Sequence, residues 1–378
     1  MIHMTPQQGD MCRRLPPFPL TYIKDLTKPM KKLLVIAGIL LAATSAHAMG
    51  SKKAAQPIKE TVNVWVGFGV GGGYDTAART FAKHLPKHLP GNPTVVVRNK
   101  PGAGSAKLLN SLYTNSPTTG YDIAFFHPGA MQIAIYGKRK VNFKPEGFQY
   151  IGNMYTDVNS CVVWKGAGQN IKTFADLKNS KSTVFFGAGS PVSAMSSYPL
   201  FLKNALGANL KVIYGYRGTR QTVKAMASKE LQGSCGLFES SILGSYKNYW
   251  DDGDMNPFIQ LDVKKKTNFF GPDATLLSSL LPTDKLKQAS QFVFGIDILT
   301  RPILAPPKLP KANVAILRKA FTDTMNDPEL KAEIKKRFLI DADPLDGEAV
   351  QQFIVDMINT PQSIVDEAWK LTQPPKRK

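Results

Sequence analysis

The sequence predicts an α/β protein of two lobes, each a mostly parallel sheet flanked by helices. Apolar strands and amphipathic helices alternate from residue 61 to residue 126, which is the pattern of a parallel sheet with helices on both faces. A similar alternation restarts at Cys161 and continues to Phe238. The chain of 378 residues is also too long for one ordinary core, and it suits lobes of ~150 residues.

The first alternation begins with the run Thr-Val-Asn-Val-Trp-Val at 61–66, which predicts a buried strand. A glycine-rich loop leads from this strand into a helix at 74–85. In that helix Ala77 and Phe81 share an apolar face, and Asp75 suits the dipole of the first turn. The remaining elements of this lobe follow in order: a strand at 94–97, a turn at 100–104, a helix at 105–113 and a strand at 121–126.

The second alternation follows a loop-rich stretch. Thr173 is the expected N-cap of its first, short helix. The expected elements are a strand at 161–164, a helix at 173–177, a strand at 183–186, a helix ending near 206, a strand at 211–214, a helix ending near 229 and a strand at 235–238. A Pro-rich segment at 301–310 then precedes helices at 312–325, from 327 onward, and at 347–358, the last one expected.

A secretion signal begins inside the chain, at Met30. Two lysines follow this methionine, residues 33–43 form an apolar run, and an Ala-His-Ala cleavage site ends at Ala48. The apolar run is shorter than the ~20 residues that span a bilayer. We therefore expect a periplasmic protein whose signal peptide is 30–48 and whose residues 1–29 are an over-extended gene start. A membrane anchor at the same place is the alternative.

Two cysteines of the expected mature chain, Cys161 and Cys235, lie in apolar, strand-like runs. An oxidising compartment would let them pair, and two buried free thiols would fit the same positions. The sequence favours free thiols, because cysteines on neighbouring strands seldom reach the Cα separation of ~4.4–6.8 Å that a disulfide needs.

The formal net charge of +20 favours anionic partners without identifying one. Lys and Arg are scattered, with short clusters such as 264–266 and 376–378. The sequence contains no recognition helix, zinc-ligand spacing or aromatic-interleaved basic stretch of the kind that nucleic-acid-binding modules have. We therefore expect no nucleic-acid partner, and a surface that small acidic ligands can approach.

The loop after the first strand, Gly67–Gly73, contains the pattern G-x-G-x-x-G between a strand and a helix, as in a dinucleotide-binding site. Such a site also needs an acidic residue at the end of the second strand, whereas this strand ends in Arg98-Asn99. Glycines let backbone N–H groups reach a ligand, and a helix N-terminus favours negative charge, so a carboxylate also suits the loop. We favour an anion-binding loop over a dinucleotide site or a plain turn. Its candidate ligand contacts are Phe68, Gly69, Val70, Gly71, Gly72, Tyr74 and Asp75.

A second glycine loop, with the sequence Gly187-Ala188-Gly189-Ser190, stands between a strand and a helix of the second lobe. It repeats the arrangement of the first loop, so the two loops would face each other across a cleft. Ser190 is equally suited to be a plain N-cap. Ser193, about one helical turn further on, either adds a hydroxyl to a ligand or is an ordinary surface serine.

His127 follows the third strand of the first lobe, at the carboxyl edge where open α/β sheets bind ligands. Contact with a bound carboxylate and a capping or packing role are both open. Catalysis is not indicated, because G-x-S-x-G is absent and no oriented partner would make His127 a general base. Pro86 separates His84 from His88, so we expect both of these to be surface residues. We predict no enzyme activity, no cofactor and no metal site.

Several segments resemble one protein family in their sequence and in their order. The turn Asn-Lys-Pro-Gly-Ala-Gly at 99–104, combined with the preceding glycine loop, is the most specific of them. The matching segments are Val64–Asp75, 98–104, 119–123, 216–218, 304–307 and 324–330. On these segments the chain resembles the substrate-binding proteins of tripartite tricarboxylate transporters, also called Bug-type receptors, across nearly all of 58–358.

The resemblance implies a two-lobed periplasmic binding protein of the type II-like class, whose cleft between the lobes closes on a ligand. Lobe I would comprise 49–157 and 294–378, and lobe II would comprise 158–293. The family's ligands are small organic carboxylates, which the receptor delivers to the large and small membrane subunits of its transporter. A receptor of this kind is expected to be a monomer without catalytic activity.

In this family, backbone N–H groups of two loops hold a carboxylate of the ligand. The resemblance implies that the corresponding loops here are Phe68–Gly73 and Gly187–Ser190. Arg217 and Glu239, which follow the next two strands of lobe II, complete the candidate ligand contacts. We expect these N–H groups, and no arginine fork, to hold the anion.

One departure from the family concerns the first loop. The family has Pro-Phe-Pro-Pro where this chain has Gly67-Phe68-Gly69-Val70, so the loop here offers more N–H groups and is less pre-organised. The identity of the ligand therefore stays open. Two other functions remain as alternatives: an exported NADP-type oxidoreductase that uses the glycine loop, and a ligand-sensing module for a signalling receptor.

Overall fold

The computed structural model describes residues 56–375 except 117–119, 167–169, 192, 263–268 and 272–273. The expected gene-start segment 1–29 and signal peptide 30–48 lie outside the described residues. Residues 53–378 belong to one compact unit, to which the whole description below applies. Among the described residues, no helix combines the length and the apolar character that crossing a membrane requires.

The first sheet contains the strands of the first predicted alternation and three strands that enter from elsewhere in the chain. Its order is β12-β4-β11-β3-β1-β2. β1 pairs in parallel with β2 and β3, whereas β11 is antiparallel to β3 and β4, and β12 is antiparallel to β4. The bounds are β1 Val62–Val66, β2 Val95–Asn99, β3 Ile123–Phe125, β4 Gln149–Asn153, β11 Pro302–Ala305 and β12 Leu345–Asp346.

The second sheet has the order β10-β9-β5-β8-β6-β7. β6 is parallel to β7 and β8, and β10 is parallel to β9, whereas β5 runs antiparallel between β8 and β9. The bounds are β5 Asn159–Trp164, β6 Val184–Ala188, β7 Leu210–Tyr214, β8 Gly233–Phe238, β9 Met255–Gln260 and β10 Thr275–Leu276. The α/β prediction is confirmed, with sheets that are mixed because β5, β11 and β12 run against their neighbours.

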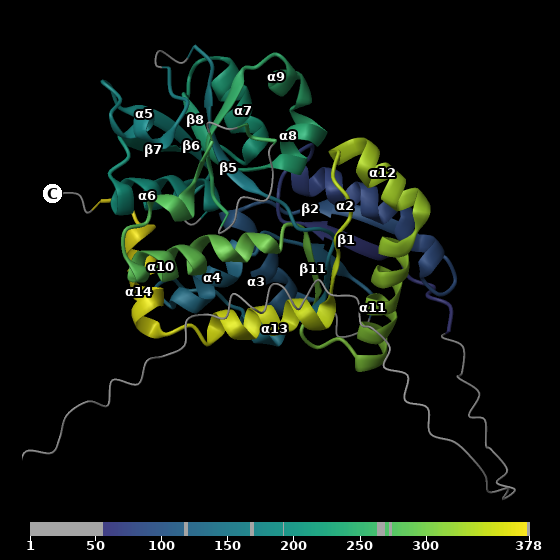
Figure 1. The fold of residues 1–378 in the computed structure, drawn as a ribbon. Helices are drawn as coiled ribbons and strands as arrows, with labels where there is room; N and C mark the ends of the chain where they lie inside the picture. Colours follow the sequence, from purple (N-terminus) through teal and green to yellow (C-terminus); the bar gives the residue numbers. More distant parts are fainter. Residues whose placement is uncertain are drawn as a thin grey trace, which may run out of the picture. The chain divides into compact units, whose positions relative to one another are not determined.

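Helices flank both sheets (Figure 1). The chain passes from the first sheet to the second between β4 and β5. The helices are α2 Gly73–His84, α3 Ala106–Asn115, α4 Gly129–Tyr136, α5 Phe174–Lys178, α6 Ala194–Leu206, α7 Thr219–Ala227, α8 Glu239–Ser245, α9 Lys247–Asp251, α10 Asp284–Phe294, α11 Lys311–Asn326, α12 Pro328–Phe338, α13 Gly347–Ile358 and α14 Gln362–Leu371. The lobe boundaries at 157/158 and 293/294 stay a prediction.

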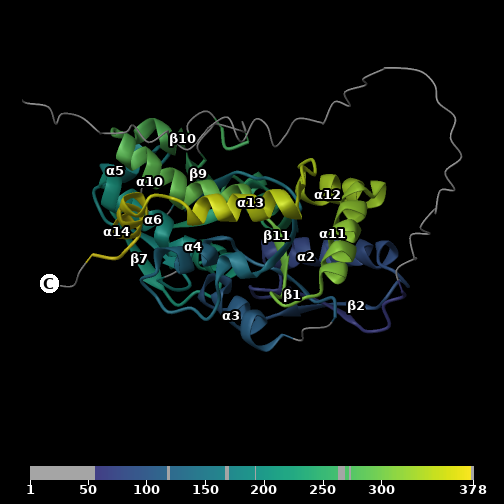
Figure 2. The ribbon, with the colours of Figure 1, turned by 90° about the horizontal axis from the view of Figure 1, so that it is seen from below.

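The prediction that 347–358 is the last helix was wrong, because α14 follows it. Ile364, Val365 and Ala368 of α14 are buried in the same apolar cluster as Phe186 and Phe258 of the second sheet. α14 lies beside α6 and α10 in both views of the ribbon (Figures 1 and 2). The carboxyl end of the chain, which the prediction assigns to lobe I, therefore packs beside the second sheet.

The expected loop-rich stretch before Cys161 contains α4 and β4. Met131 and Tyr150 from these two elements are buried in one apolar cluster. By contrast, the amphipathic helix predicted at 74–85 is confirmed as α2, whose Ala77 and Phe81 are fully buried. The ring centroid of Phe81 lies 5.8 Å from that of Phe125 on β3, so this helix packs directly on the first sheet.

Cys161 and Cys235 form a disulfide, so the preference for two free thiols was wrong. The two cysteines lie directly opposite each other where β5 pairs with β8 in antiparallel register. The sequence could not specify this register, because strand-like patterns identify strands without identifying which residues face each other.

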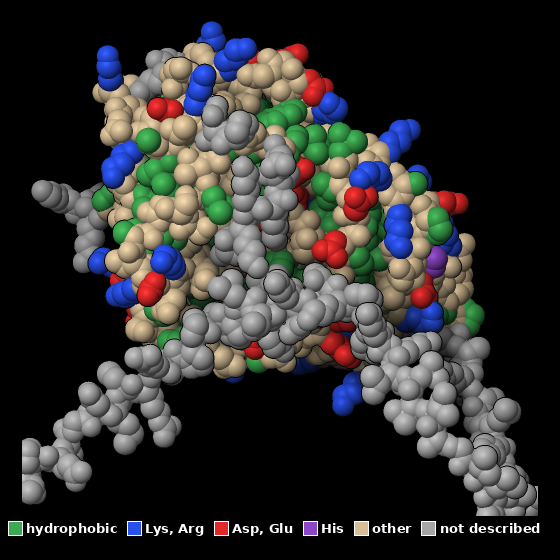
Figure 3. Space-filling view, viewed as in Figure 1, with side chains coloured by type: hydrophobic (Ala, Val, Ile, Leu, Met, Phe, Trp, Pro, Cys, Tyr) green, Lys and Arg blue, Asp and Glu red, His purple; other side chains and the backbone are tan. Residues whose placement is uncertain are grey.

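Positive charge is dispersed on the face that Figure 3 shows. Lys and Arg side chains alternate there with acidic, polar and apolar ones (Figure 3). This agrees with the scattered basic residues of the sequence.

Candidate functional site

A cavity of about 570 Å³ lies between loops of the two lobes, and we call it the cleft. The first lobe contributes the glycine loop, the start of α2 and the end of β3. The second lobe contributes the start of α6, the residues that lead into α7, and the end of β8. The lining residues are Phe68, Gly69, Val70, Gly72, Gly73, Tyr74, Pro101, Gly104, His127, Ser193, Ala194, Met195, Arg217, Gly218, Thr219, Arg220, Gln221, Lys224, Gly236, Phe238 and Ser241.

The first glycine loop is anchored at both of its ends. The N–H of Gly67 donates to the carbonyl oxygen of Phe125 at 3.1 Å, which continues the pairing of β1 with β3. Gly71 has a φ of +81°, a left-handed conformation that favours glycine. The helix α2 then starts at Gly73, and its N-cap Gly72 has no side chain to cap it. The N-terminal end of α2 is therefore available to an anion in the cleft.

Asp75 belongs to the framework of this loop and does not line the cleft. Its carboxylate accepts hydrogen bonds from the N–H of Gly71 at 2.9 Å, from Arg79 at 3.0 Å and from Asn99 at 2.8 Å. Burial alone would raise the pKa of Asp75, but these hydrogen bonds outweigh it and lower the pKa. The N–H of Gly71 is thereby committed to Asp75, whereas the N–H groups of the loop residues that line the cleft, Gly72 and Gly73 among them, remain as donors toward it.

The second predicted loop packs against its own lobe. A Cβ added to Gly189 would lie 2.5 Å from the carbonyl oxygen of Tyr216, and one added to Gly187 would lie 2.3 Å from Leu231. The N–H groups of residues 215 and 216 both donate to the carbonyl of Ala188. None of Gly187, Ala188, Gly189 and Ser190 lines the cleft, and Glu239 at the start of α8 does not either.

Ser193 brings the second lobe's hydroxyl to the cleft, at the N-cap position of α6. Its Oγ donates to the carbonyl of Ser190 at 2.8 Å. The buried hydroxyl of Ser190 itself has no hydrogen-bond partner among the described residues.

His127 lines the cleft as a neutral imidazole whose tautomer is fixed. Its Nδ1 accepts a hydrogen bond from the N–H of Gly129 at 2.9 Å, so the proton resides on Nε2. Burial, together with the positive charge of Arg301, lowers the pKa of His127 to about 3. The ring stands edge-on to Phe68, which is stacked on Tyr74 with centroids 4.7 Å apart. The side chain therefore offers an N–H donor beside an aromatic wall.

Arg301 lies behind this wall and is fully buried. Its guanidinium lies 4.6 Å from the ring centroid of Tyr74 and 5.2 Å from that of Phe238, so it joins the two lobes. It donates to Ser240 at 3.2 Å and to Ser241 at 2.9 Å, both on α8. These acceptors are uncharged, so the guanidinium adds positive potential near the cleft. Sequence reasoning did not predict this role, because the only local feature is the Arg-Pro pair that opens a Pro-rich segment.

Asp297 is a second buried charged group near the cleft. It accepts hydrogen bonds from Tyr198 at 2.7 Å and from Asn159 at 2.8 Å, and it lies 3.8 Å from Nε2 of His127. Burial raises the pKa of Asp297 to about 7, although the hydrogen bonds from Tyr198 and Asn159 oppose the rise. Its protonation therefore changes within the ordinary pH range.

Arg217 lines the cleft as expected, and the structure adds two cations that sequence reasoning missed, Arg220 and Lys224. Nη1 of Arg220 lies 3.5 Å from the carbonyl oxygen of Val70, across the cleft from its own helix α7. The missed signal was the spacing of Arg220 and Lys224, which are four residues apart and so share one face of α7, just after Arg217.

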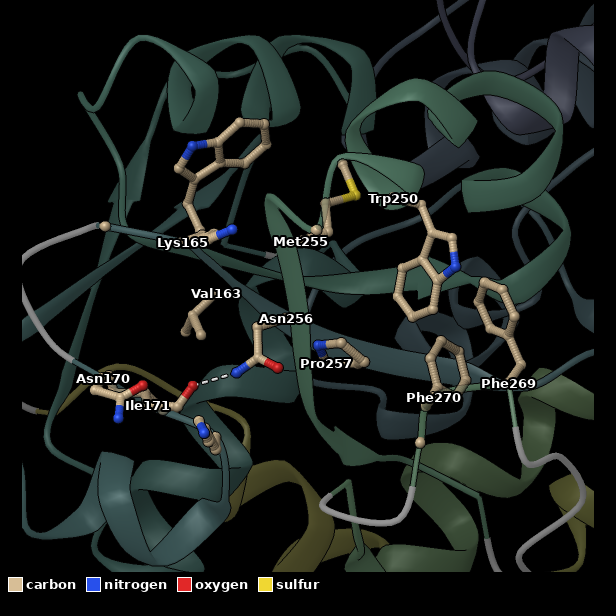
Figure 4. A pocket seen from close by; sticks show the side chains of 15 residues that line it. Val163, Lys165, Asn170, Ile171, Trp250, Met255, Asn256, Pro257, Phe269 and Phe270 are labelled. Carbon is tan, nitrogen blue, oxygen red and sulfur yellow. Dashed lines mark hydrogen bonds between the residues drawn. The ribbon is translucent and has the colours of Figure 1, made fainter.

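A larger cavity, of about 810 Å³, lies within the second lobe. Trp250, Phe269 and Phe270 gather on one side of it, opposite Val163 and Ile171 (Figure 4). Neither glycine loop lines this cavity, and neither does the start of the helix that follows each loop. It is therefore separate from the cleft.

His84 and His88 contact acidic residues of α12, and His84 is buried, so its expected surface position was wrong. Nε2 of His84 lies 2.9 Å from Glu333, and Nε2 of His88 lies 2.9 Å from Asp327. His84, Asp327 and Glu329 have a metal-compatible spacing, but the ammonium of Lys87 already contacts both carboxylates. The arrangement is an ion-pair cluster that joins the end of α2 to α12.

Solved structures with the same architecture cover most of this chain. The structure of the periplasmic binding protein BugD matches with a TM-score of 0.65 at 20% sequence identity, covering 83% of this chain and 98% of that one. The chain has the fold of a Bug-type periplasmic binding protein. MatC from Rhodopseudomonas palustris, solved with bound malate, matches with a TM-score of 0.62 at 16% identity over 81% of this chain and 98% of its own. A further R. palustris protein, solved with adipate, matches with a TM-score of 0.62 at 18% identity over 82% and 97%.

No protein-family model and no curated protein matches the sequence. The structural matches confirm the two-lobed, type II-like fold class and, at the level of fold, the resemblance to Bug-type receptors.

Proposed function

We propose that the protein is a periplasmic solute-binding receptor that captures a small organic carboxylate and delivers it to a tripartite tricarboxylate-type membrane transporter. The observation that carries this proposal is the composition of the cleft. It combines the uncapped start of α2 with three cationic side chains, and none of the described residues that line it is Asp or Glu. A cavity of this kind favours an anion.

The proposed contacts follow from the donors that remain available. One carboxylate accepts hydrogen bonds from the N–H groups of Gly72 and Gly73 and from Nε2 of His127. Arg301 adds long-range attraction from behind Tyr74. The lobes close because the ligand contacts both of them and so binds the closed form more tightly than the open one. The malate and adipate in the structural relatives agree with a carboxylate ligand.

The side chains at the end of the second strand disfavour the alternative of an NADP-type oxidoreductase. A dinucleotide site needs a free side chain at the end of this strand for the ribose. Here Asn99 donates to the carbonyl of Phe68 at 2.9 Å and to Asp75, while Arg98 donates to Asn63 at 2.7 Å. Both side chains are engaged within the first lobe.

The test is a thermal-shift screen over organic acids, followed by calorimetry with the acids that raise the melting temperature. We expect at least one carboxylate to bind, and NADP to cause no shift. Binding of NADP without binding of any acid would contradict the proposal. Delivery to a transporter is tested by pull-down of the candidate membrane subunits with ligand-loaded and ligand-free protein.

A further inference from the structure

Asp297 is a buried acid that contacts elements of both lobes beside the cleft. It belongs to the short helix η5 (Gly295–Ile298), in the segment that leads from α10 to β11. Tyr198 of α6 and Asn159 of β5 donate hydrogen bonds to its carboxyl group, and His127 approaches it from the end of β3. The side chains of Asp297 and His127 are both more than nine-tenths buried. A buried acid thus lies next to an imidazole that lines the cleft.

Nε2 of His127 is the atom that links Asp297 to the proposed ligand. It carries the proton of the neutral imidazole, because Nδ1 accepts the hydrogen bond from the N–H of Gly129. Oδ1 of Asp297 lies 3.8 Å from Nε2. A ligand carboxylate that accepts from the same N–H would lie about 2.9 Å from Nε2, and hence no more than about 7 Å from Oδ1. Two negative charges this close in a buried site repel each other, and protonation of one acid relieves the repulsion.

The surroundings of Asp297 also accommodate its neutral form. Nδ2 of Asn159 donates to Oδ2 of Asp297 at 2.8 Å, whereas Oδ1 of the same amide is buried and has no hydrogen-bond partner among the described residues. A buried acceptor without a partner costs free energy. A protonated carboxyl group has one O–H donor, and it can pair with an amide by accepting one hydrogen bond and donating another. Protonation of Asp297 would thus supply a donor beside an acceptor that lacks one.

Several titratable groups interact with Asp297 from the elements packed around it. These groups are Tyr198 on α6, His127 after β3, Tyr74 on α2, Asp157 between β4 and β5, and Asp262 after β9. Burial raises the pKa of Asp297 to about 7, the hydrogen bonds from Tyr198 and Asn159 oppose this rise, and the two nearby acids add to it. The pKa of His127 is lowered to about 3, so this imidazole stays neutral when Asp297 titrates. The guanidinium of Arg301 donates to serines of α8, and within the described part of the chain it forms no ion pair with Asp297.

We infer that Asp297 is a positioning residue that takes up a proton when a carboxylate ligand binds at His127, so that ligand binding and proton binding are coupled. This inference rests on the proposed function. The proton comes from solvent and forms an O–H bond on Asp297, and no covalent bond of the ligand changes. Protonation removes the repulsion between the two carboxylates and leaves the Nε2–H of His127 to the ligand. An ionised Asp297 would instead compete with the ligand for this N–H.

The test is calorimetry on the mature protein with malate, adipate, hexanoate and benzoate, from about pH 6.5 to about pH 9, where these carboxylates are ionised. The binding enthalpy is measured in HEPES and in Tris, which differ in their ionisation enthalpies, so the difference between the two gives the number of protons taken up. We expect uptake of up to one proton per ligand. Above about pH 7 the affinity should decrease by as much as about tenfold per pH unit, because the proton must then be taken from solvent.

Three variants assign the proton to Asp297. Asp297→Asn imitates the neutral acid, so it should take up no proton and keep, across the whole range, the affinity that the wild type has at the lowest pH. Tyr198→Phe removes a hydrogen bond that stabilises the ionised carboxylate, so its affinity should begin to decrease at a higher pH than that of the wild type. Asp284→Asn is the control and should keep the wild-type pH profile, because Asp284 is an exposed acid of α10 that does not line the cleft.

The outcomes separate the coupling from the proposed function. If an acid binds without proton uptake and Asp297→Asn has the wild-type pH profile, the coupling is refuted while the carboxylate receptor stands. If none of the four acids and none of the broader screen binds, the proposed function fails and the coupling fails with it. Proton uptake that persists in Asp297→Asn would also overturn the assignment, because another group would then take up the proton. Should Asp297→Asn not fold, Tyr198→Phe decides, and an unshifted pH profile in that variant refutes the coupling.

Discussion

Replacing Gly73 with alanine tests whether α2 and α8 meet when the cleft closes. Gly73 is the first residue of α2, and α8 of the second lobe packs against this helix. A Cβ at Gly73 would lie 2.3 Å from Oγ of Ser241, 3.1 Å from its Cβ and 3.0 Å from Nη2 of Arg301. Rotating the serine hydroxyl away would cost its hydrogen bond from Arg301 and would still leave two close contacts.

The expected magnitude follows from these distances. Carbon and oxygen atoms in ordinary contact are about 3.5 Å apart, so α2 and α8 must separate by about 1 Å. Overpacking of this kind costs about 1–3 kcal/mol. If the two helices meet only in the closed form, the cost falls on that form and affinity should decrease ~5- to 150-fold, whereas contact in both forms would lower stability and leave affinity unchanged.

Calorimetry with an acid from the screen measures this loss. Gly295→Ala is the matched control, because a Cβ at Gly295 would meet open space and Gly295 does not line the cleft, so its affinity should equal that of the wild type. The double variant Gly73→Ala with Ser241→Ala should recover much of the loss, since it removes the closest atom. Unchanged affinity together with unchanged stability in Gly73→Ala would show that α2 and α8 do not approach each other in the ligand-bound form.

Three further predictions concern stability and charge. Thiol counting under denaturing, non-reducing conditions should find Cys161 and Cys235 unreactive, and Cys161→Ala with Cys235→Ala should lower the free energy of unfolding by about 2–4 kcal/mol. Folding raises the pKa of Asp297 from 3.8 to about 7. Its contribution to the free energy of unfolding is therefore present below about pH 4 and is lost as the pH rises to about 7. The loss is at most about 4 kcal/mol. The difference between Asp297→Asn and wild type should therefore grow in favour of the variant across this range in urea titrations. His127, whose pKa is lowered to about 3, makes the free energy of unfolding increase with pH below 6.5. This effect is the same in the wild type and in the variant, so it does not change the difference between them. Arg301→Met should keep the fold but weaken carboxylate binding in calorimetry more than Lys211→Met does, because Lys211 is an exposed cation of β7 that does not line the cleft. Equal affinities would exclude an electrostatic role for Arg301.

The strands and loops that build the cleft's first side were predictable because local patterns decide them. A run rich in valine, a glycine loop and an amphipathic helix identify β1, the loop and α2 without knowledge of the rest of the chain. Asp75 was placed correctly in the first turn of α2. Its commitment to Gly71 and Asn99 was not predictable, because Asn99 comes from the next strand and only the parallel pairing of β1 with β2 brings it near.

The features that the sequence missed depend on distant partners. α4 and β4 lack a clear period, since α4 is apolar on most sides and β4 contains glycine and asparagine. The cations at 220 and 224 look like ordinary surface residues until the second lobe places them across from the glycine loop. Arg301 shows the same limit, because a lone arginine in a sequence gives no sign that three aromatic rings will surround it.

The return of α14 to the second lobe has a consequence for biosynthesis. Its Val365 and Ala368 complete an apolar cluster that begins with Tyr136 and includes Phe292 of α10. A chain that emerges with its amino-terminus first therefore presents this apolar surface uncovered until its last helix has been released. For the periplasmic receptor that we propose, this cluster would stay incomplete until α14 had crossed the membrane, so α14 would complete the core last.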